Sequence, residues 1–440
     1  MATKASLSGF PEWLPDGRIV EQEILDTARR VFELHGFASL ETRSVEPVDV
    51  LLRKGEIDKE VYGIRRLQGD DEADLALHFD LTVPFARYVV DNAGQLVFPF
   101  RRYQIQKVWR GERPQEGRFR EFTQADIDIV DADHLAPHHE AEMALVMAEV
   151  FAQLPIPRAV IRVNNRKILE GFYRGLGIAD PAPVLRALDK LDKIGADNVR
   201  RLLVDDAGLA PSAADLCLRL AEIRTPDASF AEQVRALGVS DALLDEGVAE
   251  LTAVLAAVNA ARPGAILADL HIARGLDYYT GTVYETFLDG YESFGSVCSG
   301  GRYDSLASDG RTTYPGVGIS LGVTRLVSLL LGRGLARASR SVPSAVLVAV
   351  VDEDSRASSD RVAEALRNRG IPCEVSARAD KFGKQIRYAD RRGIPFVWFP
   401  DPGGDTVKDI RSGEQVPADP ATWEPPRDDL RPHVTRGDET

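Results

Sequence analysis

The sequence predicts an α+β protein, and three observations along its 440 residues support this fold class. Two strand-like segments, 97–110 and 119–130, are separated by the polar stretch GERPQEGR, which is typical of an antiparallel pair with a long loop. Residues 166–258 are rich in Ala and Leu at helical spacing. After 344, strand-like and helix-like segments alternate, as in a small α/β domain. The chain therefore combines an antiparallel sheet, a helical insertion and an α/β domain.

The first part opens with a helix. Asp16 can cap it, apolar residues such as Ile24, Ala28 and Phe32 follow the helical period, and Gly36 ends it. Further elements are expected at 38–45 and 74–80 (strands), 137–153 (a helix) and 158–164 (a strand).

Changes in composition divide the chain into six segments. They are the first part of the sheet domain (1–165), the helical insertion (166–258), the second part of the sheet domain (259–333), a linker (334–344), the α/β domain (345–426) and a polar tail (427–440). The tail is expected to be frayed.

The bulk composition excludes several classes of protein. With 44% hydrophobic and 28% charged residues, the chain is typical of globular proteins. No apolar run approaches the roughly 18 residues of a membrane span, and the N-terminus lacks the apolar core of a signal peptide. Three widely spaced cysteines, an odd number, predict a reducing cytoplasm without disulfides.

The charge is uneven. The net charge of −14 argues against non-specific binding of nucleic acid. Residues 101–120, however, hold seven Lys/Arg against two acids, and residues 378–392 hold six against two. Two basic islands on an acidic protein indicate a polyanion that is contacted at chosen places. For either island taken alone, an ordinary solvated surface is at least as good an interpretation.

Common nucleotide and metal motifs do not fit. There is no GxxxxGK[ST], and GVGISLG (316–322) has one residue too many for GxGxxG. His138, His139 and Glu140 are expected on a solvated helix face, because adjacent histidines point apart and no partner ligands follow nearby. Cys298 has no histidine at an obvious partner spacing, so a buried structural thiol is expected there rather than a nucleophile.

The strand FREFTQADIDIV carries an unusual face. By the period-2 rule Phe122, Gln124, Asp126 and Asp128 lie on the same side, just after Arg110 ends the preceding strand. An aromatic ring beside an arginine can sandwich a purine, and a guanidinium can grip a phosphate. Acids and amides on that face can hold an ammonium group. The alternative is the solvent side of a two-sided sheet.

Three further segments repeat this mixture of arginines, acids and aromatics. They are LHFDLTVPFARY, with Asp80 and Thr82 expected on one strand face; SGGRYDSL, with Arg302 and Tyr303; and GVGISLGVTRL, with Arg325 where a helix can begin. The stretch ARGLDYYTGTVYE adds Arg274 and a group of tyrosines, Tyr278, Tyr279 and Tyr284. Together they predict a site for a phosphate-bearing adenine compound and a small cation.

These motifs match one family over roughly residues 7 to 415. The chain resembles the histidyl-tRNA synthetases, which are class II aminoacyl-tRNA synthetases. ARGLDYYTGTVYE and SGGRYD resemble the two histidine-specific motifs, VWRGERPQEGRFREF resembles class II motif 2, and GVGISLGVTRL resembles motif 3. KFGKQIRYADRRGIPFVWF resembles the C-terminal anticodon-binding domain. Five motifs in the family's order make the resemblance specific.

The resemblance implies an antiparallel catalytic core of six to seven strands, a helical insertion domain and a C-terminal α/β anticodon-binding domain. It implies ATP-dependent attachment of histidine to tRNA(His) through histidyl-adenylate, in a cytoplasmic homodimer with motif 1 in its interface. ATP is then a substrate accompanied by Mg²⁺, and the resemblance leaves open whether the protein itself has a metal site.

The resemblance also assigns residues. ATP is expected to contact Arg110 at its α-phosphate, Phe122 and Glu112 around the adenine, and Arg325 at its γ-phosphate. Histidine is expected to contact Asp80, Thr82, Gln124 and Asp128 with its amino group and nearby polar atoms, and Tyr278, Tyr279 and Tyr303 around its ring. Arg274 is expected to stabilise charge at the α-phosphate during in-line displacement, as a second catalytic arginine beside Arg110. Contacts with tRNA are expected from Arg113, Gln115 and Arg120 near the acceptor stem and from Lys384, Arg387 and Arg391 near the anticodon.

Three positions depart from the family pattern. Arg43 stands where motif 1 has a proline, Thr324 where motif 3 has an acid before its arginine, and Ser299 where an alanine is usual. The first bears on the dimer interface and the second on the ATP site.

Two other functions compete with this reading. One is the non-catalytic regulatory subunit of ATP phosphoribosyltransferase, which usually lacks the anticodon-binding domain and parts of the motifs. The other is a histidine- or tRNA-sensing module, which would need an effector domain that no stretch of this chain supplies.

Overall fold

The computed structural model describes residues 7–52, 60–68, 74–272 and 278–437. The chain forms two compact units, one made of Met1–Pro11 and Ile24–Leu329, the other of Glu12–Glu23 and Leu330–Thr440. None of the helices within the described residues is long and apolar enough to cross a membrane.

Helix α1 (Pro15–Leu34) begins one residue before Asp16, so Asp16 lies in its first turn and does not cap it as predicted. Ile24, Ala28 and Phe32 are buried, so the apolar stripe predicted from their spacing is confirmed. Gly36 follows the helix with φ +75°, a conformation that favours glycine.

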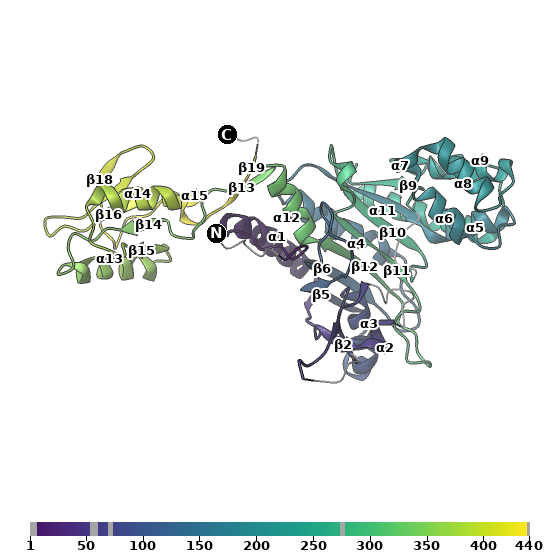
Figure 1. Cartoon of the computed structure of the whole chain (residues 1–440), viewed down its shortest axis with the longest axis horizontal. Coiled ribbons are helices and arrows are strands. Elements are labelled where there is room, and N and C mark those ends of the chain that lie inside the picture. Colours follow the sequence, from purple (N-terminus) through teal and green to yellow (C-terminus); the bar gives the residue numbers. More distant parts are fainter. Residues whose placement is uncertain (1–6, 53–59, 69–73, 273–277, 438–440) are drawn as a thin grey trace. The chain divides into compact units, whose positions relative to one another are not determined.

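The first unit is built on a nine-stranded sheet (Figure 1). Its strands, in spatial order, are β1 (Ala38–Ser39), β5 (Phe100–Trp109), β6 (Glu121–Val130), β12 (Gly316–Gly322), β11 (Cys298–Tyr303), β10 (Thr282–Leu288), β7 (Ala159–Asn165), β9 (Ile266–Asp269) and β8 (Arg224–Thr225). The six strands from β5 to β7 are antiparallel to their neighbours, whereas β1 and β9 run parallel to β5 and β7. The predicted antiparallel core is confirmed, with short strands added at both edges.

Strands β5 and β6 form the predicted long pair. Their register places Arg102 opposite Asp128 and Trp109 opposite Glu121. Near the loop end, the Trp109 indole N–H donates to Glu121 Oε2 at 2.9 Å, and Lys107 forms an ion pair with the same carboxylate. These contacts hold the register where the connecting loop, 110–120, leaves the sheet.

A smaller layer departs from the prediction. Strands were expected at 38–45 and 74–80, but only β1, β2 (Val45–Pro47) and β4 (Leu75–Leu77) form there, and β2 and β4 pair with β3 (Gly63–Ile64) in a three-stranded sheet. Helices α2 (Val48–Leu52) and α3 (Thr82–Asn92) follow these strands, and a short 3₁₀ turn (Ala93–Gln95) closes the segment. The expected strand face with Asp80 and Thr82 is therefore wrong: Thr82 begins α3 instead.

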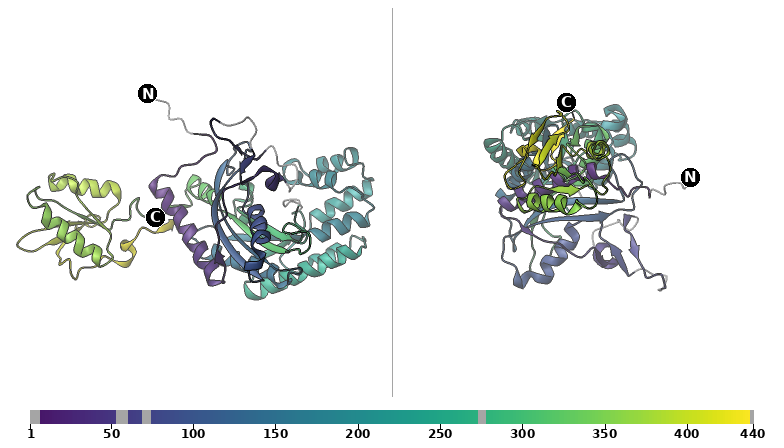
Figure 2. Two further views of the ribbon diagram at one scale, coloured as in Figure 1. Left: turned by 90° about the horizontal axis from the view of Figure 1, so that it is seen from below. Right: turned by 90° about the vertical axis from the view of Figure 1, so that its left-hand side faces the viewer.

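Helices form most of the chain between β7 and β9. They are α5 (Arg166–Gly175), α6 (Ala182–Leu188), α7 (Leu191–Ile194), α8 (Ala196–Asp205), α9 (Pro211–Ala221), α10 (Phe230–Arg235) and α11 (Ala242–Ala261). Helix α4 (His138–Ala152), which precedes β7, packs against α11. Figure 2 shows these helices gathered beside the sheet, and β9 and β8 are the last two strands at one edge of that sheet.

The second unit contains a five-stranded sheet with the order β15 (Cys373–Val375), β14 (Val346–Val348), β16 (Phe396–Phe399), β17 (Thr406–Asp409) and β18 (Gln415–Pro417). Helix α13 (Arg356–Asn368) packs on one face through Val362 and Leu366, and α14 (Phe382–Arg392) packs on the other through Ala389. This is the α/β arrangement that the alternating sequence predicts.

The expected linker and tail meet each other. Strand β13 (Ala336–Ala338) pairs with β19 (Val434–Arg436), and a short helix, α15 (Arg427–Leu430), precedes the latter. The expectation of a frayed tail is wrong for these residues, because their backbone groups are paired across the small sheet.

Candidate active site

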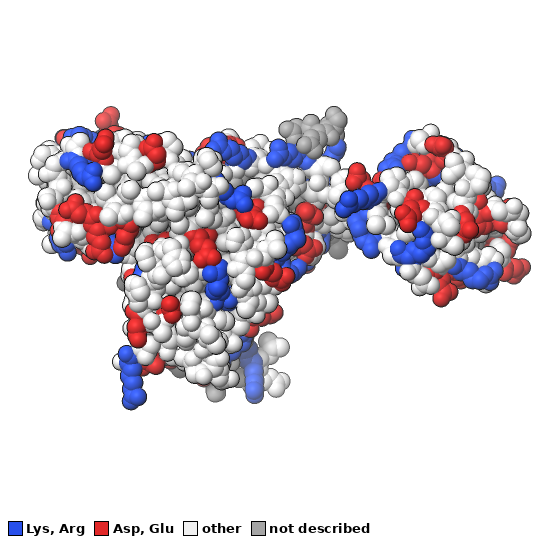
Figure 3. Space-filling view, turned by 180° about the vertical axis from the view of Figure 1, so that it is seen from behind, with Lys and Arg blue, Asp and Glu red and all other residues white. Residues whose placement is uncertain are grey.

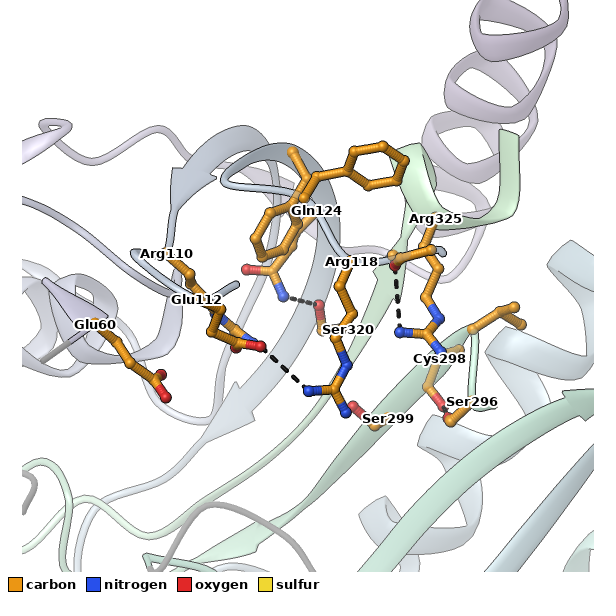
Figure 4. Close-up of a pocket in the computed structure, with 15 residues that line it drawn as sticks. Glu60, Arg110, Glu112, Arg118, Gln124, Ser296, Cys298, Ser299, Ser320 and Arg325 are labelled. Atoms are coloured by element: carbon orange, nitrogen blue, oxygen red, sulfur yellow. Dashed lines mark hydrogen bonds and ion pairs between the residues drawn. The ribbon is translucent and has the colours of Figure 1, made fainter. Parts of the chain in front are cut away.

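A pocket of about 410 Å³ opens where β5 and β6 leave the sheet (Figure 4). Its wall comes from the 110–120 loop, from β6, from the ends of β11 and β12, and from α12 (Val323–Gly332). The lining residues are Glu60, Arg110, Glu112, Gly117, Arg118, Phe119, Phe122, Gln124, Ser296, Val297, Cys298, Ser299, Ser320, Gly322 and Arg325. Four of the predicted ATP-site residues thus share one pocket.

Arg110 and Phe122 form one side of this pocket. The guanidinium carbon of Arg110 lies 5.1 Å from the centroid of the Phe122 ring, and Arg110 Nε donates to the Phe79 carbonyl at 3.0 Å. Glu112 reaches back from the loop, with its carboxylate 3.3 Å from an Arg118 nitrogen. A guanidinium held beside a half-buried aromatic ring on a pocket wall suits a planar base that carries a phosphate.

Arg325 lies on the opposite side, in the first turn of α12. It donates to the carbonyls of Gly117 and Phe294 at 3.3 and 2.5 Å, and its guanidinium carbon lies 5.1 Å from the Phe294 ring. Burial lowers its pKa, and the neighbouring charge of Arg118 lowers it further. Gly117 has φ +70°, and a Cβ there would lie 2.4 Å from the Phe294 ring, so only glycine fits this contact.

The polar face of β6 leads inward from the pocket. Gln124 Nε2 donates to the Ser320 hydroxyl at 2.8 Å, while Gln124 Oε1 is buried without a hydrogen-bond partner among the described residues. Gln124, Asp126 and Asp128 are all buried, so the alternative of a solvent-facing strand face is wrong. An unpaired buried acceptor is costly, and a ligand with N–H donors would satisfy it.

Asp128 is the centre of a buried network. Tyr303 donates its hydroxyl hydrogen to Asp128 Oδ1 at 2.8 Å, and an Arg102 nitrogen lies 2.6 Å from Asp128 Oδ2. Two glycines make room: a Cβ on Gly318 would lie 2.1 Å from Asp128 Oδ1, and one on Gly316 would lie 2.5 Å from the Tyr303 ring. The glycines of GVGISLG therefore serve close packing within the sheet, as the missing phosphate-loop pattern suggests.

The remaining tyrosines of the predicted histidine site lie beside this network. The rings of Tyr278 and Tyr279 are 4.6 Å apart, and Tyr278 lies edge-on to Tyr303 at 6.1 Å. A Cβ on Gly301 would lie 2.8 Å from the Tyr279 ring, so the glycines of SGGRYD admit this side chain. Burial raises the pKa of the Tyr279 hydroxyl, which therefore stays protonated.

Asp80 reaches the same cluster from a helix terminus. Its Oδ1 accepts from the Val83 backbone N–H at 3.0 Å, in the first turn of α3. Thr82 is the first residue of that helix, and its side chain hydrogen-bonds with the Tyr278 hydroxyl. Because the carboxylate caps the helix, its position is fixed by backbone geometry rather than by a sheet face.

Some predicted residues lie elsewhere. Tyr284 donates to the Glu140 carbonyl at 2.6 Å, and Arg302 forms ion pairs with Glu140 and Asp304 at 2.9 and 3.0 Å, so both tie the sheet to α4 and the following turn. Arg274 lies outside the described residues.

The prediction of a solvated face is confirmed for His138, which is exposed, and is wrong for His139 and Glu140, which are buried. His139 is buried and its Nδ1 lies 2.9 Å from Glu142 Oε2, while the rings of His138 and His139 lie 4.1 Å apart. Glu140 is also buried and forms an ion pair with Arg302. Cys298 is buried as predicted, and burial raises the pKa of its thiol, which makes it a poor nucleophile.

The two larger departures from the family pattern have local partners. Arg43 lies 2.7 Å from Glu46, a buried carboxylate that Arg87 also contacts at 2.8 Å. Thr324 turns its hydroxyl toward β6 and accepts from the Thr123 backbone N–H at 2.8 Å. Thr324 thus joins α12 to the sheet and is not among the residues that line the pocket.

The predicted RNA-contact residues are accessible. Arg113 and Gln115 are exposed on the 110–120 loop, and Arg120 is half-buried with its Nε 3.3 Å from the Glu112 carbonyl. Lys384, Arg387 and Arg391 are exposed on α14, where Lys384 pairs with Asp380 at 3.1 Å. Figure 3 shows basic and acidic side chains interspersed over one face of the molecule, so that face carries no broad basic surface.

Sequence reasoning missed several residues of this region, among them four with polar or charged side chains. Glu60, Arg118 and Ser320 line the pocket, and Arg102 supports it from β5. The register of β5 against β6 and of β6 against β12 brings Arg102 and Ser320 into place, and no local sequence signal reveals that register.

Comparison with known proteins places this geometry in a family. A sequence model described as histidyl-tRNA synthetase matches residues 9–326, and one described as an anticodon binding domain matches residues 345–416. A histidine–tRNA ligase of Micrococcus luteus is 61% identical over 455 aligned positions, which cover 99% of each chain.

Solved structures agree in fold. The histidyl-tRNA synthetase of Nostoc sp. PCC 7120 is 36% identical with a TM-score of 0.85, covering 95% of this chain and 97% of that one. A Bacillus halodurans protein described as an ATP phosphoribosyltransferase regulatory subunit/histidyl-tRNA synthetase has a TM-score of 0.73 at 17% identity, covering 89% and 97% of the two chains. The latter likeness concerns the fold alone.

Proposed function

The chain belongs to the histidyl-tRNA synthetase family, and on this premise we propose how its pocket carries out the family's reaction. The protein is a histidine–tRNA ligase, which joins histidine to tRNA(His) at the expense of ATP. The histidine carboxylate attacks the α-phosphate of ATP, forming histidyl-adenylate and releasing pyrophosphate. A hydroxyl at the 3′ end of the tRNA then takes the histidyl group, and AMP leaves.

One observation carries the placement of ATP: Arg110 and Phe122 meet on the wall of one pocket, with 5.1 Å between guanidinium carbon and ring centroid. The Phe122 ring stacks on adenine, and Arg110 grips the α-phosphate, where negative charge grows during displacement. Glu112, which faces Arg118 across the pocket mouth, contacts the adenine or the acceptor end of the tRNA.

Arg325 receives the γ-phosphate. Its guanidinium is desolvated and is held by two carbonyl oxygens, from the 110–120 loop and from the turn at Phe294. Neutral carbonyls are weaker partners than a phosphate, so the triphosphate would displace them. ATP binding therefore also rearranges the loop at Gly117.

Histidine lies deeper, along the polar face of β6. Asp80, Thr82, Gln124 and Asp128 hold its ammonium group and nearby atoms, and the unsatisfied Gln124 Oε1 supports this assignment. Tyr279 and Tyr303 meet the imidazole, with Tyr278 packed behind them. Arg274 adds positive charge at the α-phosphate; this role rests on its place in the ARGLDYYTGTVYE motif.

Magnesium enters as part of the substrate, bound to the phosphates of ATP. No cluster of three or more His, Cys, Asp or Glu side chains able to hold a metal ion occurs within the described residues. We assign the charge stabilisation that the protein itself supplies to Arg110, Arg274 and Arg325, on the place of these residues in the family's motifs.

The remaining partners follow from the family. Transfer RNA contacts Arg113, Gln115 and Arg120 at its acceptor stem, and Lys384, Arg387 and Arg391 at its anticodon arm. We propose a homodimer with motif 1 in the interface, which a molar mass in solution of twice that of one chain would support. We place the protein in the cytoplasm, where its three buried free cysteines would stay reduced.

The deciding experiment for this function is amino-acid-dependent exchange of pyrophosphate into ATP. Exchange with histidine, and with none of the other amino acids, is expected. A folded protein that binds histidine without exchange would instead be a regulatory relative.

A further inference from the structure

Asp126 lies at the centre of the polar face of β6, between Gln124 and Asp128, and the function proposed above gives it no role. The residue is 3% exposed, and its Oδ1 atom has no hydrogen-bond partner among the described residues. Buried acceptors of this kind are rare, because an unmade hydrogen bond costs free energy in a dry interior. The residue therefore calls for a functional reason.

Acidic groups outnumber basic groups around this carboxyl. The titratable and polar groups that face it are Arg102 and Gln104 from β5, Asp128 from β6, Ser320 from β12, Cys298 from β11, Asp80 from the start of α3, and Tyr279. Burial raises the pKa of Asp126 to about 7, Arg102 opposes the rise, and the charge of Asp128 adds to it. When two carboxyl groups share a site, one of them tends to hold a proton.

The geometry decides which carboxyl group takes that proton. Arg102 lies 2.6 Å from Asp128, and Tyr303 donates to Asp128 at 2.8 Å, so the ionised form of Asp128 is stabilised twice. Asp126 interacts with the Ser320 hydroxyl, and its buried Oδ1 has no hydrogen-bond partner among the described residues to stabilise a negative charge. Asp126 is therefore the member of the pair that gains and loses the proton.

Ser320 connects Asp126 to the proposed substrate. Its hydroxyl accepts from Gln124 Nε2 at 2.8 Å and forms a hydrogen bond with Asp126. Gln124 and Asp128 are both proposed histidine contacts, and Asp126 lies between them on the same strand face. A ligand that reaches both neighbours passes over Asp126.

Histidine has a side chain that matches such a group. The imidazole pKa is near 6.5, so the ring gains or loses a proton close to neutral pH. A protonated carboxyl can donate to a neutral ring nitrogen, or an ionised carboxyl can accept from an imidazolium N–H. Both arrangements contain one proton and one hydrogen bond.

We propose that Asp126 is a further histidine-binding residue and that its carboxyl group shares one proton with the imidazole of the substrate. This inference rests on the function proposed above and names what that function leaves open, the protonation state in which histidine is taken up. Side chains such as those of glutamine and asparagine do not titrate, so they cannot share the proton. The carboxyl group is thus also a specificity device.

The proton count gives a sharp test. Before binding, the Asp126 carboxyl and the imidazole of free histidine together carry less than one proton above about pH 7 and more than one below about pH 6.5. The complex carries one proton between them. Histidine should therefore bind with uptake of close to one proton at pH 8, with release at pH 6, and with the highest affinity between about pH 6.5 and 7. Calorimetric titration of the full-length protein with L-histidine, in phosphate and in Tris at each pH, measures the number of protons directly.

The variant Asp126→Asn supplies the main comparison. Its amide is the same size and does not titrate, so proton uptake at pH 8 should fall to near zero. Asp309→Asn, which changes an exposed acid, is the matched control and should behave as the wild type. Ser320→Ala removes a bond that favours the ionised carboxyl, so the pH of half-maximal uptake should rise, which tests the idea even if Asp126→Asn does not fold.

The possible results distinguish failure of the shared proton from failure of the proposed function. Histidine binding by the wild type without proton uptake at pH 8 would overturn the shared proton and leave the proposed function intact, as would uptake that persists in Asp126→Asn. Absence of histidine binding by the folded wild type would contradict the proposed function itself.

Discussion

Arg110 lies over the ring of Phe122, with its guanidinium carbon 5.1 Å from the ring centroid, although Arg110 follows β5 and Phe122 lies in β6. The β5–β6 register brings them together: Arg110 follows the last residue of β5, and Phe122 pairs with Val108 on that strand. The Arg110 backbone N–H donates to the Arg120 carbonyl at 2.9 Å, which extends the ladder past the strand end. A phosphate contact and a base-stacking surface are therefore built into one piece of backbone.

The Phe122 ring should set the affinity for ATP. Phe122→Ala should raise the KM for ATP by about 10- to 100-fold, because stacking on an aromatic ring is worth about 1–3 kcal/mol per base. Phe122→Tyr keeps the ring and is the matched control, with a KM close to that of the wild type. Steady-state kinetics at saturating histidine separate the two, and an unchanged KM in Phe122→Ala would place adenine elsewhere.

Tyr303 should act on histidine and not on ATP. Tyr303→Phe removes the hydroxyl that donates to Asp128 at 2.8 Å. It should raise the KM for histidine by about 10- to 100-fold, because a hydrogen bond to a charged group is worth about 1.5–3 kcal/mol. Tyr388→Phe removes a similar tyrosine–carboxylate bond, to Glu374 at 3.0 Å, and should leave both KM values unchanged. Equal effects of Tyr303→Phe on the two substrates would indicate a general loss of structure.

The sheet around these residues was largely predictable, since β5, β6, α4 and β7 follow alternating or helical patterns in the sequence. The sequence predicts a strand at Asp80 and Thr82 because the run around LHFDLTV is short and apolar, and such runs do not distinguish a strand from a helix start. Pro84, in the first turn of α3, is compatible with the helix that forms.

The deeper network could not be predicted for a different reason. The pairing of Arg102 with Asp128 depends on strand register, and an eleven-residue loop, 110–120, leaves register open in the sequence. The pairing of β13 with β19 joins segments about a hundred residues apart. Local composition does not reveal so distant a partner, and it therefore predicts a linker and a frayed tail.

The Asp126 carboxyl should destabilise the protein at high pH. Its folded pKa is raised from 3.8 to about 7, so the stability that it contributes is present below pH 4 and is lost as the pH rises toward 7. At pH 8 the free energy of unfolding of Asp126→Asn should therefore exceed that of the wild type by up to about 4 kcal/mol, and the variant should unfold at a higher temperature. At pH 4 the two proteins should unfold at nearly the same temperature.

The pKa of the Asp309 carboxyl is shifted in the opposite direction to that of Asp126. Backbone N–H groups of Thr312 and Arg311 lower its pKa, so Asp309→Asn should gain nothing at pH 8. Thermal unfolding followed by calorimetry at both pH values tests the pair. A wild type that is more stable than Asp126→Asn at pH 8 would show that the carboxylate is better compensated than its environment indicates.

Helix α14 should matter only for tRNA. Replacing Lys384, Arg387 and Arg391 together with Ala should raise the KM for tRNA(His) at least tenfold and reduce the slope of log affinity against log salt by about two to three. Pyrophosphate exchange, which needs no tRNA, should be unchanged. Arg361→Ala with Arg367→Ala changes two exposed arginines of α13 and is the matched control. If the control pair weakened tRNA binding as much, the assignment of α14 would fail.

The most direct test of the central claim is histidine-dependent exchange of pyrophosphate into ATP by the wild type, Arg110→Ala and Arg113→Ala. Arg110 is proposed to meet the α-phosphate, whereas Arg113 is exposed on the same loop and is proposed to meet tRNA alone. The account predicts exchange with histidine only, a loss of about 10²- to 10³-fold in Arg110→Ala, and wild-type exchange in Arg113→Ala. Exchange that does not require histidine, or that survives in Arg110→Ala within a few-fold, would contradict it.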